Sequence, residues 1–149
     1  VRRVYVSDET FVFHQMSAMT PADLSPADAL DLLHAGNARF VAGEPLAPNR
    51  TADRLRAVAP AQAPFAAFLG CADSRVPVEI IFDQGFGDLF VTRVAGNITT
   101  PEITASLEFG AGVLGAKVLF VLGHTACGAV TAAAAAQEVP GQISSLFYH

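Results

Sequence analysis

The stretch LGCADSRVP (residues 69–77) joins an apolar segment to three reactive side chains. Residues 65–70 (FAAFLG) are apolar, and Pro77 closes the stretch. A short apolar run bounded in this way predicts a strand that is buried on both faces. Cys71, Asp73 and Arg75 occupy alternate positions directly after that strand, and alternation predicts that their side chains point to one side.

Two further apolar runs predict strands, at 89–94 (LFVTRV) and 117–122 (KVLFVL). Helical patterns at 78–82 and 101–114 separate the three strands, and a third helical pattern at 126–137 follows the last strand. Apolar strands that alternate with helices are typical of parallel sheets covered on both faces. The sequence therefore predicts an α/β fold with a mostly parallel central β-sheet flanked by helices. Residues 139–147 are a possible fourth strand.

An N-terminal helical arm is expected before the sheet. Ser25 can cap a helix, Pro26 suits its first turn, and Asp28 can complete a capping box. Gly43 is a plausible C-terminal stop for this helix. Residues 44–64 are rich in Pro, Ala and Arg, which favours a loop with a short helix around 52–58.

Composition limits the possible functions. The chain has 149 residues, 52% of them hydrophobic and 15% charged, which suits one globular domain. Its net charge is −5 and it has no run of basic residues, so nucleic-acid or anionic-membrane binding has little support. No apolar stretch reaches transmembrane length, and no signal-peptide pattern is present. We therefore expect a cytoplasmic protein with reduced thiols.

Both ends of the sequence are atypical. Residues 1–19 show no sustained period and contain Met16 and Met19, either of which could be a natural start. We expect residues 1–23 to be an N-terminal extension and residues 24–149 to form the domain. The sequence stops at ISSLFYH without a terminating signal, so it could be a C-terminally truncated fragment.

The candidate chemistry lies where two predicted strands end. Cys71 follows the first strand, and the sequence GHTACG, with His124 and Cys127, follows the third. Open α/β sheets bind ligands at the carboxyl ends of their strands, so we expect the two motifs to meet. Two thiols and one imidazole form a ligand set that suits zinc and leaves a fourth position for water. A buried cysteine alone is commonly only a small hydrophobic residue, but the combination favours a metal.

Asp73 and Arg75 could form an ordinary surface ion pair, which would contribute little stability. Their position beside the expected metal favours a functional role. A carboxylate can accept a hydrogen bond from a metal-bound water, and an arginine can clamp that carboxylate and keep it ionised.

The segment GAGVLG (residues 110–115) matches the glycine spacing of a dinucleotide-binding loop. That loop needs a strand before it and a helix after it. Here a helical pattern precedes the glycines and a strand follows them, so we interpret the segment as close helix packing and reject nucleotide binding.

The segments CADSRVPVEIIFDQGFGDLFVTRVAGN and VLGHTACGAV resemble β-class carbonic anhydrases, and GNARFVAG resembles the N-terminal arm of that family. The resemblance runs from about Leu24 to the C-terminus. It implies that zinc is held by Cys71, His124 and Cys127 and that Asp73 and Arg75 form a catalytic dyad.

The resemblance also implies a substrate pocket. Gln62 matches a substrate-binding glutamine of the plant-like subtype, Phe90 and Ala95 match its apolar pocket, and Phe109 stands where that subtype often has tyrosine. The chain has no tryptophan, whereas the other subtype uses one in an inhibitory bicarbonate site. We therefore favour the plant-like subtype with an open site.

The implied function is zinc-dependent, reversible hydration of carbon dioxide to bicarbonate and a proton by a zinc-bound hydroxide. Tyr148 and His149 are candidates for the proton shuttle by their chemistry alone. A second possibility is hydrolysis of carbonyl sulfide or carbon disulfide at the same site. A third is a non-catalytic, zinc-stabilised fragment.

Assembly is also implied. Family members are homodimers or larger, with the pocket built across the subunit interface, and they continue beyond ISSLFYH with another helix and an edge strand. Residues 1–41 contain a helix that cannot bury its apolar face by itself, so we expect this arm to pack on the neighbouring subunit of an obligate dimer.

Overall fold

The computed structural model describes residues 23–148. Residues 1–22 of the expected extension, which include Met16 and Met19, lie outside this range, as does His149. Its main elements follow the predicted order: α1 (Pro26–Ala42), α2 (Ala52–Val58), β1 (Ala66–Cys71), α3 (Val78–Ile81), β2 (Leu89–Val94), α4 (Pro101–Glu108), β3 (Val118–Leu122) and α5 (Gly128–Ala134). No helix in residues 23–148 is long and apolar enough to cross a membrane.

The three strands form one parallel sheet in the order β2-β1-β3. β1 is central and buried along its whole length, as its unbroken apolar sequence predicts. Its last residue, Cys71, pairs with Val94 of β2, so the carboxyl ends of these strands lie at one edge of the sheet. The predicted α/β class and parallel sheet are confirmed.

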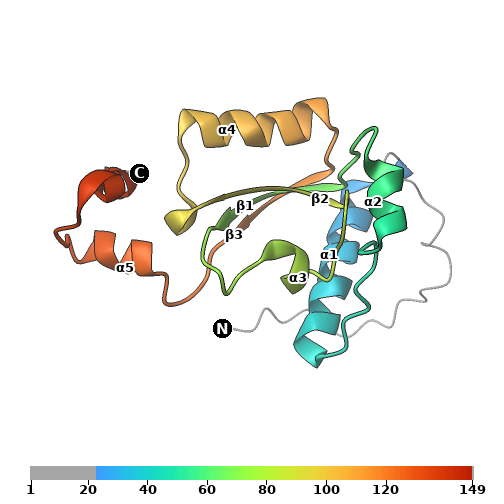
Figure 1. Cartoon of the computed structure of the whole chain (residues 1–149), viewed down its shortest axis with the longest axis horizontal. Helices are drawn as coiled ribbons and strands as arrows, with labels where there is room; N and C mark the ends of the chain where they lie inside the picture. Colours follow the sequence, from blue (N-terminus) through green and yellow to red (C-terminus); the bar gives the residue numbers. More distant parts are fainter. Residues whose placement is uncertain (1–22, 149) are drawn as a thin grey trace.

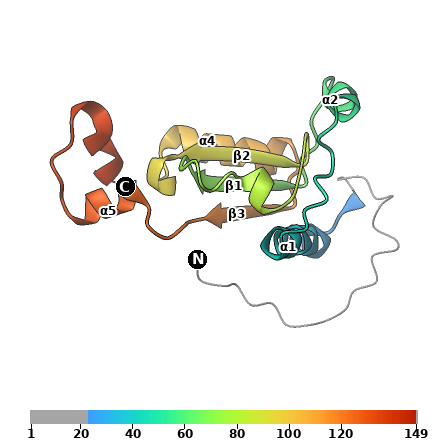
Figure 2. The ribbon, with the colours of Figure 1, turned by 60° about the horizontal axis from the view of Figure 1, so that its bottom comes forward.

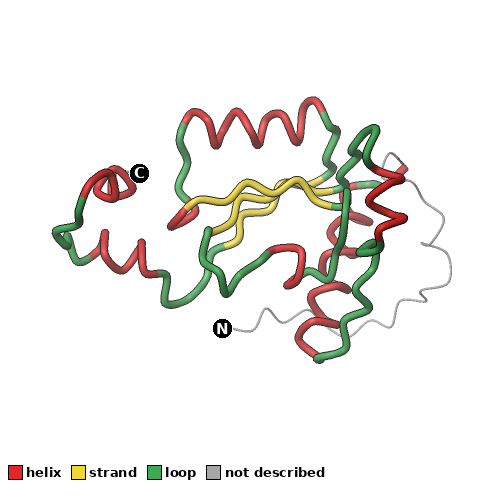
Figure 3. Tube along the Cα trace, in the orientation of Figure 1, coloured by secondary structure: helices red, strands yellow, loops and turns green. Residues whose placement is uncertain are grey.

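Helices cover the two faces of the sheet. α4 lies over one face, while α1 and α3 lie on the other (Figures 1 and 2). Beyond the carboxyl edge of the sheet, a loop leads from β3 to α5 (Figure 3). This loop and the last residue of β1 carry the expected ligands.

The core lies between the sheet and the layer formed by α1 and α3. Phe68, Phe82 and Phe120 contact one another there, with ring centroids 5.0 to 5.4 Å apart. Leu33 of α1 and Val78 of α3 are fully buried in the same cluster. This packing fixes β1 against both helices and so fixes the position of Cys71 at its end.

The N-terminal helix begins and ends as predicted. Ser25 and Asp28 form the capping box, and Gly43 closes the helix in the left-handed conformation at φ 76°. The expectation that α1 cannot bury its apolar face by itself holds for part of that face, because Leu30, Phe40 and Val41 are 37%, 41% and 75% exposed. Its buried stripe includes Ala29 and Leu33, and these side chains pack in the core of the same chain.

Helices flank both faces of the sheet, but the cover is incomplete on the face of β3 turned toward α4. Leu119 and Val121 are 48% and 57% exposed, whereas Phe120 packs into the core on the other face. α4 lies over β1 and β2, so it leaves this part of the neighbouring strand uncovered.

Two other segments also differ from the prediction. Residues expected as a possible fourth strand form a 3₁₀ helix, Gly141–Tyr148, in which Ser145 caps the carbonyl of Gln142. Local turns satisfy this backbone without a neighbouring strand. The helix predicted over 101–114 becomes a π-helix at Phe109–Val113. As predicted, the glycine motif at 110–115 follows a helix and precedes a strand, so it lacks the strand-before and helix-after context of a dinucleotide-binding loop.

A buried carboxylate ties α1 to the rest of the domain, and the sequence did not predict it. Asp83 is fully buried and accepts hydrogen bonds from Arg39 Nε at 2.7 Å and from the backbone N–H groups of Leu46 and Ala47 at 3.0 and 2.9 Å. Burial raises the pKa of Asp83, but these donors outweigh it and hold the pKa below its usual value.

Replacing Asp83 with asparagine is expected to lower the free energy of unfolding at pH 7 by about 2–3 kcal/mol, because buried donors lose a charged acceptor. The low folded-state pKa stabilises the fold above the unfolded pKa of about 3.9, and this stabilisation is lost as the pH falls further. Urea unfolding from pH 7 to pH 3 should therefore show the difference from wild type shrinking below about pH 4. A constant difference across this range would contradict the assignment.

Candidate metal centre

Three chain segments bring two thiols and an imidazole together at the carboxyl edge of the sheet. Cys71 ends β1, His124 lies in the loop after β3, and Cys127 immediately precedes α5. The ligand atoms of the three residues all lie within 4.8 Å of one another. The motifs separated in sequence therefore meet, as predicted.

The spacing of the sulfur atoms fits a shared metal ion. The two Sγ atoms lie 3.8 Å apart, far beyond the roughly 2.05 Å of a disulfide. Two thiolates bound to one tetrahedral zinc, at about 2.3 Å each, would be separated by about 3.8 Å. Both cysteines are buried and free. Their geometry favours a bound ion over a disulfide.

His124 offers the third ligand atom. Its Nδ1 lies 3.0 Å from the carbonyl oxygen of Thr125. Because a carbonyl only accepts, Nδ1 carries the proton in this contact and Nε2 keeps its lone pair. Nε2 is buried and has no hydrogen-bond partner among the described residues. An orphaned imidazole nitrogen beside two thiols is what a soft divalent cation would satisfy.

Backbone donors favour the thiolate form of Cys71. The N–H groups of Asp73 and Gly96 donate to its Sγ at 3.4 and 3.3 Å. Burial raises the pKa of the Cys71 thiol, but these two donors, His124 and Cys127 together lower it to about 7. Metals bind the thiolate, so the site is prepared for a cation.

Arg75 clamps Asp73 with both sides of its guanidinium. Nε donates to Oδ1 at 2.9 Å and Nη2 donates to Oδ2 at 2.6 Å. These bonds hold the pKa of Asp73 well below its usual value, so the carboxylate stays ionised. Its Oδ2 lies 3.7 Å from Nε2 of His124, which places an ionised oxygen beside the three candidate metal ligands.

The clamp arises from a turn rather than from strand alternation. β1 ends at Cys71, and the backbone N–H of Arg75 donates to Oδ1 of Asp73 at 2.9 Å. The N–H of Val76 closes the turn on the Asp73 carbonyl at 3.1 Å. An aspartate that bonds to backbone two residues ahead is typical of turns. The predicted pair is therefore present, but alternation is not the reason.

Arg75 also links the loop that follows β1 to the loop that precedes α5. Nη2 of Arg75 also donates to the carbonyl of Ala126 at 3.0 Å. Ala126 has φ 56°, a left-handed conformation that costs energy for a residue with a Cβ. The bond from Arg75 helps hold this conformation, directly before Cys127.

The predicted pocket residues are divided between the two ends of the sheet. Ala95 follows β2 beside the cluster, where its neighbour Gly96 contacts Cys71. Phe90 is paired with Ala67, four residues before Cys71, which is about 13 Å along a strand.

Phe109 contacts the Phe90 ring at a centroid distance of 6.1 Å, so it too lies away from the cluster. Gln62 precedes β1 and is exposed at the opposite edge of the sheet. Tyr148 is exposed on the last 3₁₀ helix. Within one subunit the cluster therefore has only Ala95 of the predicted pocket beside it.

Sequence reasoning missed Arg93, a charged residue in the apolar strand LFVTRV. Its guanidinium donates to the carbonyls of Cys71 and Asp73 at 2.8 and 2.6 Å. The one feature of the sequence that could have indicated this role is a single charge in β2, a strand that pairs with the buried β1.

Known proteins share this fold and these motifs. The family model described as "Carbonic anhydrase" matches residues 66–149. "Carbonic anhydrase 2" of Mycobacterium tuberculosis is 48% identical over 112 residues, which cover 75% of this chain and 54% of that protein. "Carbonic anhydrase" of Mycolicibacterium smegmatis is 45% identical over 123 residues, which cover 83% and 59%. The chain spans little more than half the length of these curated relatives.

Solved structures agree. A Coccomyxa β-carbonic anhydrase in complex with acetazolamide superposes with a TM-score of 0.58 at 28% identity, covering 85% of this chain and 55% of that one. One chain from the work on two tetrameric β-carbonic anhydrases of Sordaria macrospora gives a TM-score of 0.59 at 32% identity, covering 63% and 49%.

Proposed function

Because the chain belongs to the β-carbonic anhydrase family, we propose that it is a zinc enzyme that reversibly hydrates carbon dioxide to bicarbonate and a proton. The observation that carries this proposal is the cluster of Cys71, His124 and Cys127 with a clamped carboxylate beside it. When bound, zinc supplies the Lewis acidity that makes water nucleophilic near neutral pH. Cys71, His124 and Cys127 would hold the ion with three ligand atoms, a number that would leave room for water to bind.

The chain's own residues orient the reaction. Asp73 is an ionised acceptor whose direction is fixed by Arg75, so it can take a hydrogen bond from the attacking water and aim a lone pair at the substrate. Since Arg75 engages both carboxylate oxygens, Asp73 is held back from replacing water as a ligand. This supports the open form of the site near neutral pH.

A complete pocket needs more than the residues that one subunit places at the cluster. Gln62, Phe90 and Phe109 lie toward the other edge of the sheet. We expect them to serve the site of a second copy, which agrees with a pocket built at a shared surface. The plant-like assignment of these residues is part of this proposal.

The chain is therefore expected to form a dimer or a larger homo-oligomer at micromolar concentration. The exposed apolar side chains of Leu119 and Val121 are available for burial in an interface, which would be large if the assembly is obligate. Sedimentation velocity across a concentration series measures the oligomer. A well-folded monomer with full zinc content and full activity would contradict this expectation.

Substrate choice is tested on one zinc-loaded preparation. Stopped-flow hydration of carbon dioxide should be rapid, and turnover of carbonyl sulfide and carbon disulfide should be much slower. Faster turnover of either sulfur compound would replace the proposed substrate. Stoichiometric zinc without turnover of any of the three would instead favour a non-catalytic zinc module.

A further inference from the structure

Arg93 connects β2 to the backbone at Cys71 and Asp73, where the chain leaves β1 and enters the loop of residues 72–76. It stands in β2, opposite Gly70, one position before the pair formed by Val94 and Cys71. Its Nε donates to the Cys71 carbonyl at 2.8 Å and its Nη2 donates to the Asp73 carbonyl at 2.6 Å. One guanidinium thus spans the backbone from the thiol to the carboxylate.

The two bonds fix the segment in which the chain leaves the sheet. After Cys71 the ladder continues only with the N–H of Ala72, which donates to Val94 at 3.1 Å. Beyond that bond the carbonyl of Asp73 has two donors, Arg93 and the N–H of Val76. A charged, planar donor is well suited to hold two carbonyls at once, and its hydrogen bonds are stronger than neutral ones.

We propose that Arg93 is a positioning residue, which sets the place of the Asp73 carboxylate relative to Cys71 through their backbone carbonyls. Among the described residues, Arg93 donates to the backbone carbonyls of Cys71 and Asp73 and not to the thiol or carboxylate atoms themselves; it acts through the chain that carries them. Its effect on the reaction rests on the proposed carbonic anhydrase activity, whereas its effect on the loop does not.

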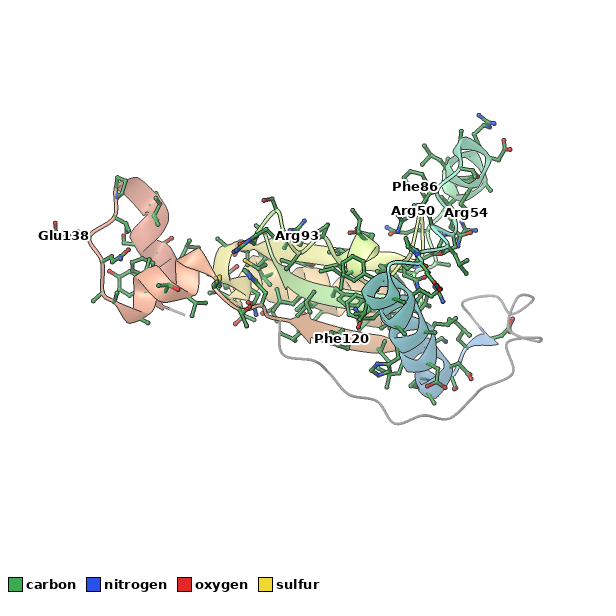
Figure 4. All side chains as sticks on the ribbon, turned by 90° about the horizontal axis from the view of Figure 1, so that it is seen from below. Arg50, Arg54, Phe86, Arg93, Phe120 and Glu138 are labelled. Carbon is green, nitrogen blue, oxygen red and sulfur yellow. The ribbon has the colours of Figure 1, made fainter. Side chains whose placement is uncertain are left out.

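Arg50 provides a matched control elsewhere in the fold. Its guanidinium also donates to two backbone carbonyls, those of Gln84 and Glu79, at 2.9 and 3.1 Å. Figure 4 shows Arg93 over the sheet and Arg50 apart from it, near Arg54 and Phe86. Arg50 also lies 3.7 Å from Oδ1 of Asp83, so removing it deletes a similar pair of hydrogen bonds together with an ion pair, but at a place away from residues 72–76.

Hydrogen exchange of the full chain, as purified with its metal, tests the proposal for Arg93→Ala, Arg93→Lys and Arg50→Ala. Arg93→Ala should speed amide exchange at residues 72–76 by about tenfold or more, because two charged hydrogen bonds are lost. Arg93→Lys should give an intermediate rate, since its ammonium cannot form the same planar bridge. Arg50→Ala should speed exchange around Gln84 and leave residues 72–76 unchanged.

A cobalt-substituted sample provides the second measurement. Arg93→Lys should bind one equivalent with altered visible bands, and its kcat for carbon dioxide should fall while KM stays near wild type. Unchanged exchange at 72–76 in the Arg93 variants, or equal acceleration across the whole sheet, would overturn the proposal. If Arg93→Ala does not fold, Arg93→Lys decides by the same criteria. An inactive wild-type chain would refute the proposed function and leave the exchange result valid.

Discussion

Cys127→Ser is expected to lose its metal and to reduce carbon dioxide hydration to the uncatalysed background. Cys127 supplies one of the two sulfurs at the cluster, and its Sγ lies 3.8 Å from that of Cys71. A serine hydroxyl is a far poorer zinc ligand than a thiolate, and two remaining ligands hold the ion weakly. Elemental analysis and stopped-flow hydration of the same sample measure both losses.

Ala134→Ser is the matched control, since it adds a hydroxyl at an exposed position of the same helix, α5. It should keep one zinc per chain and wild-type turnover. Full zinc content and activity in Cys127→Ser would exclude Cys127 from the site and, with it, the proposed ligand set.

Asp73→Asn is expected to lower kcat for carbon dioxide by about 100-fold or more while the zinc content stays at one per chain. The amide cannot accept at both positions that Arg75 engages, and it presents a donor where the proposed water needs an acceptor. Arg75 lowers the pKa of Asp73, so wild-type activity should show no loss from protonation of Asp73 above about pH 4.

Asp53→Asn is a suitable control for this loss of charge. Asp53 forms an ion pair with Arg56 on α2, but both side chains are exposed and remain outside the cluster. Such pairs contribute little, so zinc content and turnover should be unchanged. A near-normal kcat in Asp73→Asn would show that the carboxylate does not orient the reaction.

The sequence predicted the elements whose signals are local. The capping box of Ser25 and Asp28, the stop at Gly43 and the unbroken apolar run of β1 each have a physical cause within a few residues. Local pattern could not show that α1 packs on its own core, because that depends on which face meets Phe82 and Phe68. Nor could it show which face of β3 stays exposed, since an apolar sequence looks the same whether or not a helix covers it.

The ligand set was predictable because strand ends meet at one edge of a parallel sheet, so Cys71 and the loop carrying His124 and Cys127 had to approach each other. The roles of Arg93 and of the buried Asp83 could not be predicted from the sequence. Each acts on backbone groups far away in the sequence, and such partners follow from the folded register rather than from residue spacing.

Cobalt titration of the wild-type chain, followed by absorption spectroscopy, tests the central claim most directly. The account predicts saturation at one cobalt per chain, with thiolate-to-cobalt charge-transfer bands and visible bands typical of tetrahedral coordination, as two sulfurs and one nitrogen would produce. Binding without charge-transfer bands, or no binding at one equivalent, would show that Cys71, His124 and Cys127 do not form the metal centre.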